Sequence, residues 1–124
     1  MTTTRTCDRL IQRYACLADF WGYAEPGHCA RCGRRSTCGH HAIGRRAMAY
    51  RYRPENIVPL CFDCHGWTEQ NPLAADQWLT EQRPRHAVWV SVHKRIIHPN
   101  HRTNYPAEAR SLRALIAAAK KEGP

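Results

Sequence analysis

The stretch NIVPLCFDCHGW, residues 56–67, contains an asparagine, an apolar run, a Cys-x-x-Cys pair and a histidine. We predict that the apolar run belongs to the second of two short strands between residues 40 and 60, joined by an arginine-rich loop. A short helix is expected to start near residue 62 and to break at Pro72. His65 directly follows Cys64, so it is either a further metal ligand or a neighbour without a role.

A second Cys-x-x-Cys pair, Cys29 and Cys32, precedes the pair Cys61 and Cys64. Each turn lets two thiolates approach one ion, and four thiolates complete a tetrahedral zinc site at ~2.3 Å. The 28 residues between the pairs exceed the usual zinc-ribbon spacing, so the metal would clasp a substantial insert. A redox role is disfavoured because no thioredoxin-like pattern accompanies the pairs. Cys38 is close enough to the first pair to remain an alternative ligand.

The chain of 124 residues is long enough for one domain with a modest core. No apolar run approaches the roughly 20 residues of a membrane span, and the start, MTTTRTCDRL, lacks the apolar stretch of a secretory signal. We therefore expect a cytoplasmic protein that has no membrane partner. Reduced thiols in that compartment favour metal binding over disulfides for the seven cysteines.

The formal net charge is +9, and sixteen of the nineteen cationic side chains are arginines. Arginine presents a planar fork that matches phosphate oxygens. Seven arginines lie between Arg31 and Arg53, and residues 26–54 contain no acidic residue. This distribution predicts a nucleic acid partner. An anionic membrane surface is the weaker alternative, because no basic amphipathic helix stands out.

Hydrophobic periodicity divides the single domain, residues 1–124, into three parts. Residues 5–24 are predicted to form an N-terminal helix, residues 28–72 a zinc-clasped core, and residues 73–124 a mainly helical extension. Within the extension, residues 86–97 fit a strand or a helix, and we favour the helix. The segment 106–124 has the acid-first, lysine-last pattern of a helix that ends at Gly-Pro.

The insert GHHAIGRRAMAYRYRPENIV, residues 39–58, completes an ordered pattern of Cys-x-x-Cys, His-His, Asn, Cys-x-x-Cys and His. This pattern resembles the HNH endonucleases, and most of all the small zinc-clasped HNH proteins of bacteriophages. The resemblance covers residues 29 to about 72, and five elements occur in order at compatible spacings. It implies an α+β fold, in which a ββα-metal core is clasped by a four-cysteine zinc site and flanked by N- and C-terminal helices.

The resemblance also assigns roles to individual residues. His40 takes the position of the first metal ligand, His41 that of the general base, and Asn56 that of the asparagine that orients the base. His65 takes the second metal-ligand position, so that Cys64 serves the zinc and His65 the catalytic ion. Glu69 stands where many relatives have His or Asn, so it is either a ligand or a solvated helix residue. A carboxylate there would favour Mg²⁺ or Mn²⁺, although Zn²⁺ or Ni²⁺ could also bind.

The function that the resemblance implies is metal-dependent hydrolysis of DNA phosphodiesters, leaving 5′-phosphate and 3′-hydroxyl ends. Near neutral pH a histidine with an ordinary pKa of about 6.5 can accept the proton of water. Six arginines are candidates for DNA binding: Arg34, Arg35, Arg45, Arg46, Arg51 and Arg53. The expected substrate is duplex or branched DNA in a bacterial host cell, and the protein would be a monomer or homodimer. Two alternatives remain: a zinc-stabilised DNA-binding module without catalysis, and a phage packaging or recombination accessory that nicks only with a partner protein.

Overall fold

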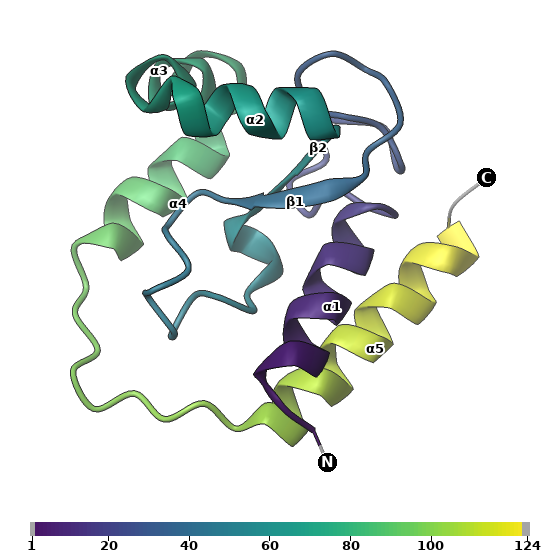
Figure 1. Cartoon of the computed structure of the whole chain (residues 1–124), viewed down its shortest axis with the longest axis vertical. Helices are drawn as coiled ribbons and strands as arrows, with labels where there is room; N and C mark the ends of the chain where they lie inside the picture. Colours follow the sequence, from purple (N-terminus) through teal and green to yellow (C-terminus); the bar gives the residue numbers. More distant parts are fainter. Residues whose placement is uncertain (1, 123–124) are drawn as a thin grey trace.

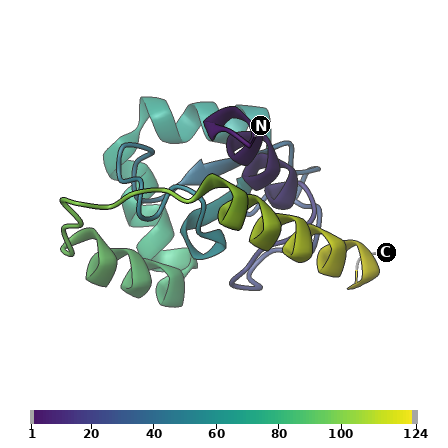
Figure 2. The same cartoon turned by 90° about the horizontal axis from the view of Figure 1, so that it is seen from below.

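In the computed structural model, which describes residues 2–122, helices surround a small antiparallel sheet (Figure 1). The N-terminal and C-terminal helices lie side by side in both views (Figures 1 and 2). The elements follow in the order α1 (Thr4–Ala15), β1 (Cys38–His41), the 3₁₀ turn η1 (Pro54–Asn56), β2 (Ile57–Leu60), α2 (Phe62–Gln70), α3 (Pro72–Gln82), α4 (Pro84–Lys94) and α5 (Tyr105–Glu122). The predicted α+β class is thereby confirmed.

Strands β1 and β2 pair antiparallel, with Cys38 opposite Leu60 and His41 opposite Ile57. Strand β2 is buried at every position, and its side chains alternate between two cores as a strand requires. Ile57 packs into the core between α1 and α5, whereas Val58 packs into the core around the cysteines. The short sheet therefore joins the two halves of the molecule.

The chain turns directly from β2 into α2. Cys61 is the N-cap of α2, and its Sγ accepts the backbone N–H of Cys64 at 3.4 Å. Helix α2 ends at Gln70, and α3 starts with Pro72, whose missing N–H is tolerated in the first turn. The strand, helix and break predicted between residues 57 and 72 are therefore confirmed.

The predicted N-terminal helix over residues 5–24 is wrong in its second half, because α1 ends at Ala15. The reason is the side chain of Asp19, which competes with helical hydrogen bonding. Its carboxylate accepts the backbone N–H groups of Trp21, Tyr23 and Ala24. The same carboxylate receives two hydrogen bonds from Arg83, each 2.8 Å long, and both side chains are almost fully buried. This buried pair replaces a longer helix by a turn attached to the start of α4.

The C-terminal extension is mainly helical, as predicted. The ambiguous segment, residues 86–97, is helical as far as Lys94, because α4 spans Pro84–Lys94, and its last three residues lie beyond the helix. Helix α5 runs to Glu122. The predicted helix stop at residues 123–124 lies outside the described residues. No helix among those described combines the length and the apolar content that a membrane crossing requires.

Gly39 provides a test of the packing between α1 and the sheet. A Cβ at this position would lie 2.7 Å from Ile57 Cγ2 and 2.9 Å from Ala15 Cβ. We expect Gly39→Ala to lower the free energy of unfolding by about 1–3 kcal/mol, because both neighbours belong to the packed core. Denaturant unfolding measures the change.

Gly66 is the matched control, because it lies within α2 and a Cβ there meets nothing within 4 Å. Gly66→Ala should raise the free energy of unfolding by about 0.5–1 kcal/mol through helix propensity. Equal stability of the two variants would contradict the tight packing at Gly39.

Candidate functional site

The four cysteines of the two Cys-x-x-Cys pairs gather in one cluster. Their Sγ atoms all lie within 4.8 Å of one another, and the Sγ atoms of Cys32 and Cys61 are 3.6 Å apart. A tetrahedral ion with bonds of ~2.3 Å separates its sulfur ligands by about 3.8 Å. Cys29, Cys61 and Cys64 are buried, whereas Cys32 is exposed. The cluster can therefore hold a metal ion such as zinc.

Local hydrogen bonds fold the first pair against β2. Gly33, with a φ of 79°, closes the knuckle by donating to the carbonyl of Cys29 at 3.0 Å. The backbone N–H of Ala30 bonds to the carbonyl of Pro59 at 2.8 Å. Cys38 is outside the cluster, and its thiol donates instead to the carbonyl of Leu60 at 3.4 Å. The cluster in the described chain consequently contains the four cysteines of the pairs and excludes Cys38.

Arg31 places a positive charge beside the cluster. Its guanidinium lies over the ring of Trp67, 3.7 Å from the centroid, and Nη1 donates to Cys64 Sγ at 3.5 Å. Four thiolates around a divalent ion carry excess negative charge, which a guanidinium offsets. Arg31 is thus held against α2 by Cys64 and Trp67.

Replacing one cysteine of the cluster tests metal binding. We expect the purified protein to carry one zinc ion per chain and Cys61→Ser to lose it, with a large fall in melting temperature, because metal binding contributes directly to folding. Native mass spectrometry and thermal melts provide the two measurements.

Cys38→Ser is the control, since Cys38 lies outside the cluster. That variant should retain its zinc. Full zinc occupancy in Cys61→Ser, or loss of zinc in Cys38→Ser, would contradict the assignment of the four ligands.

Next to the cysteine cluster, β1, α1, α2 and the loop after β1 enclose a pocket of about 420 Å³. The three histidines that the sequence singled out for catalysis line this pocket together. The complete lining is Asp8, Gln12, Gly39, His40, His41, Gly44, Arg45, His65 and Glu69. Side chains from three separate segments of the sequence therefore converge on one cavity.

His40 and His65 face each other across the pocket with ring centroids 5.7 Å apart, and His65 Nε2 is 3.5 Å from Glu69 Oε1. Burial lowers the pKa of His40 to about 4, and the neighbouring rings of His65 and His41 add to the shift. The imidazole is therefore neutral at neutral pH, as metal binding requires. Among residues 2–122, however, the ligand atoms of His40, His65 and Glu69 do not all lie within 4.8 Å of one another. The donor types suit a divalent ion, but they are spaced more widely than the cysteines.

His41 is oriented by a backbone carbonyl. Its Nε2 lies 3.0 Å from the carbonyl oxygen of Arg51, and because a carbonyl can only accept, Nε2 carries the hydrogen. Nδ1 therefore keeps its lone pair. Burial lowers the pKa of His41 to about 4, against the opposing effect of this hydrogen bond, and Arg45 and Arg51 reinforce the lowering. The ring is therefore neutral at neutral pH, and it is a weaker base in this structure than the ordinary histidine expected from the sequence.

No protein-family model, curated protein or solved structure matches this chain. The function of the chain is therefore inferred from the geometry of the pocket and from the order of its residues in the sequence.

Asn56 is fully buried and shapes the loop between the strands. Its Nδ2 donates to the carbonyls of Ile43 at 2.9 Å and Tyr50 at 3.2 Å, and its Oδ1 accepts the N–H of Ile43 at 2.7 Å. These contacts go to the loop backbone, and the ring of His41 is bound by Arg51 instead. The side chain of Asn56 therefore holds the loop at Ile43 and at Tyr50, the residue before Arg51.

Four of the six candidate DNA-binding arginines already pair with acidic side chains. Arg51 is bound by Asp8 and largely buried, and Arg45 lies 3.4 Å from the same carboxylate. Of the other two pairs, Arg34 and Asp63 are both exposed, whereas Arg53 pairs with a largely buried Glu55.

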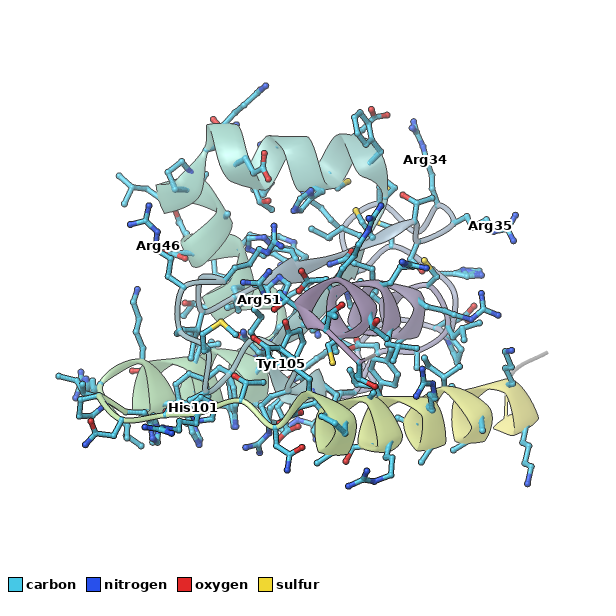
Figure 3. The ribbon with its side chains drawn as sticks, turned by 60° about the horizontal axis from the view of Figure 1, so that its bottom comes forward. Arg34, Arg35, Arg46, Arg51, His101 and Tyr105 are labelled. Carbon is cyan, nitrogen blue, oxygen red and sulfur yellow. The ribbon has the colours of Figure 1, made fainter. Side chains whose placement is uncertain are left out.

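Arg35 and Arg46 are exposed and have no ion pair among the described residues. Figure 3 shows Arg34 and Arg35 on one side of the molecule and Arg46 on the other. The six arginines therefore do not form one continuous patch.

Helix α1 contributes site residues that the sequence analysis missed. Gln12 lines the pocket and bonds to both backbone groups of Gly39, accepting its N–H at 2.7 Å and donating to its carbonyl at 3.1 Å. Asp8 lies one helical turn earlier on the same face. The available signal was this polar i, i+4 pair beside the apolar stripe of an amphipathic helix.

Proposed function

We propose that the chain is a metal-dependent DNA endonuclease with a ββα-metal core of the HNH type. One observation carries the proposal: His40, His41 and His65 line a single pocket between an antiparallel strand pair and the helix that follows it. His41 ends β1, and His65 lies in α2 next to Cys64 of the cysteine cluster. This is the arrangement that the ordered sequence pattern implies.

In the proposed reaction His41 is the general base. A water molecule transfers a proton to Nδ1, its oxygen forms a bond to phosphorus, and the bond to the 3′ oxygen breaks. The 3′ oxygen that leaves takes a proton from solvent water. The carbonyl of Arg51 holds the tautomer before transfer and stabilises the imidazolium after it. His40 and His65 would hold a divalent ion, and when bound that ion supplies positive charge that neutralises the phosphate. The products are a 5′-phosphate and a 3′-hydroxyl.

A row of arginines on α1 supports a DNA substrate. Arg5, Arg9 and Arg13 recur every fourth residue, about 6 Å apart along the axis, and all three are exposed. In the described chain none of them pairs with a carboxylate. The same helix supplies two polar side chains to the pocket wall, so a phosphate backbone bound along α1 would pass close to His41.

His41→Ala tests the assignment of the base. We expect nicking of supercoiled plasmid with Mg²⁺ or Mn²⁺ to fall about 100-fold or more, while DNA binding and the melting temperature stay near wild type. The exposed His28, outside the pocket, is the control position, and His28→Ala should cut normally. Full cleavage by His41→Ala would remove His41 from the mechanism.

A zinc-stabilised DNA-binding module is the second candidate. It is favoured by the wide spacing of His40, His65 and Glu69, which do not gather as the cysteines do. Tight plasmid binding by the wild type with no nicking under any metal would support this module over the nuclease. Nicking that appears only after a partner protein is added would support the accessory role.

The arginine row predicts a defined salt dependence. Replacing Arg5, Arg9 and Arg13 together by Gln should reduce the slope of log affinity for duplex DNA against log salt concentration by about 2 to 3, since each phosphate contact contributes about 0.9. Fluorescence anisotropy without divalent ions measures the slope.

The control variant removes the same charge from α5, by changing Arg110, Lys120 and Lys121 to Gln. These side chains are also exposed. We expect a smaller change in the salt slope for this variant. Equal changes in both variants would show that the α1 row has no special role.

A further inference from the structure

The side chain of Arg51 is held by an acidic residue from α1. Asp8 accepts Arg51 Nε at 2.9 Å through one carboxylate oxygen and Nη2 at 2.7 Å through the other. The remaining Nη1 contacts Met48 Sδ at 3.7 Å. Arg51 lies against α1 in Figure 3, and its side chain is largely buried. A two-point bond of this kind fixes both the position and the orientation of the guanidinium.

The backbone of the same residue orients His41. The carbonyl of Arg51 accepts His41 Nε2–H at 3.0 Å. The preceding carbonyl, that of Tyr50, accepts Asn56 Nδ2 at 3.2 Å. Two consecutive residues are therefore anchored in different ways: Tyr50 from the interior by Asn56, and Arg51 from α1 by Asp8.

Asp8 pairs with arginines of the loop after β1, although arginines of its own helix lie nearby in the sequence. Asp8 is the sole acidic residue between Thr4 and Ala15, and Arg5, Arg9 and Arg13 are on the same helix. Its ion pairs in the described chain nevertheless go to Arg51 and Arg45 in the loop after β1. The acidic side chain of α1 is therefore used within the chain, where it holds the loop after β1.

We propose that Asp8 is a positioning residue for the general base. By fixing the side chain of Arg51, it holds the carbonyl that keeps His41 in the Nε2–H form and leaves Nδ1 free to accept a proton. The catalytic consequence rests on the proposed nuclease function. The link from Asp8 to the tautomer of His41 does not, so the two can be tested separately.

The first test is the tautomer of His41, measured by long-range ¹H–¹⁵N NMR of the imidazole in the full chain with its zinc and no added divalent ion. At pH 7.5 we expect the wild type to show His41 with hydrogen on Nε2. Asp8→Asn should give a mixture of tautomers, and Asp8→Glu should restore the single form at least in part.

Glu55→Gln is the matched control for this measurement. It removes the carboxylate that pairs with Arg53, two residues from Arg51 in the same loop. We expect its His41 signals to match those of the wild type. An unchanged tautomer in Asp8→Asn, or an equal change in Glu55→Gln, would overturn the proposal.

The second test separates positioning from binding. We expect Asp8→Asn to lower kcat for plasmid nicking about tenfold to a hundredfold with little change in KM, because a displaced base is costly to the reaction and not to DNA binding. Asp8→Glu should recover part of the rate. If the wild type cuts DNA and Asp8→Asn has the same kcat, that result would contradict the positioning role.

Arg51→Lys covers the case in which Asp8→Asn does not fold. It removes the two-point bond but keeps the backbone carbonyl, and it should give the same mixture of tautomers. If the wild type cuts no DNA, the proposed nuclease function fails, and the NMR comparison still decides whether Asp8 orients His41.

Discussion

The rest of the structure depends on the burial of strand β2 on both faces. Ile57 packs into the core beneath α1 and α5, and Val58 and Leu60 pack into the core around the cysteines. The carbonyls of β2 accept backbone N–H groups from the first cysteine knuckle. Asn56, just before the strand, ties down the loop, and Cys61, just after it, caps α2 and joins the cysteine cluster. With contacts on both faces, this short strand can pair with β1 in one register only, because a slip by one residue would exchange its two faces.

The candidate site is positioned from both sides of this strand pair. Strand β1 carries His40 and His41, and its remaining edge is covered at Gly39 by the side chain of Gln12. Such a contact satisfies backbone groups that an edge strand would otherwise leave open. Helix α1 therefore supports both halves of the site, the strand through Gln12 and the loop through Asp8. The pocket is therefore lined by α1 as well as by β1, the loop after β1 and α2, although the histidine pattern lies in residues 40–65 alone.

Local patterns in the sequence determined most of the core around the site. Each Cys-x-x-Cys pair is a turn whose geometry depends on neighbouring residues, and the break at Pro72 follows from a missing N–H. The histidines and Asn56 could be named in advance because they occur in a fixed order: His40, His41 and Asn56 lie between the two pairs, and His65 directly follows the second. Helix signals of the same local kind located α5, whereas the segment that contains most of α4 fitted a strand or a helix. The turns and helix ends depend on interactions that span a few residues, so a linear pattern is sufficient to identify them.

Only the tertiary structure decided which distant residues act on that core. Asp19 ends the first helix early because it meets Arg83, and Asp8 reaches the loop after β1 through Arg51, in each case across more than forty positions of sequence. The sequence shows the charge of each arginine, but it does not show whether that arginine forms an ion pair with an acidic side chain. By itself, therefore, the sequence determined the α+β class, the four cysteines of the cluster and the three histidines of the pocket. The folded chain decided how α1 holds them in place, since ion pairs between distant segments form only where packing brings those segments together.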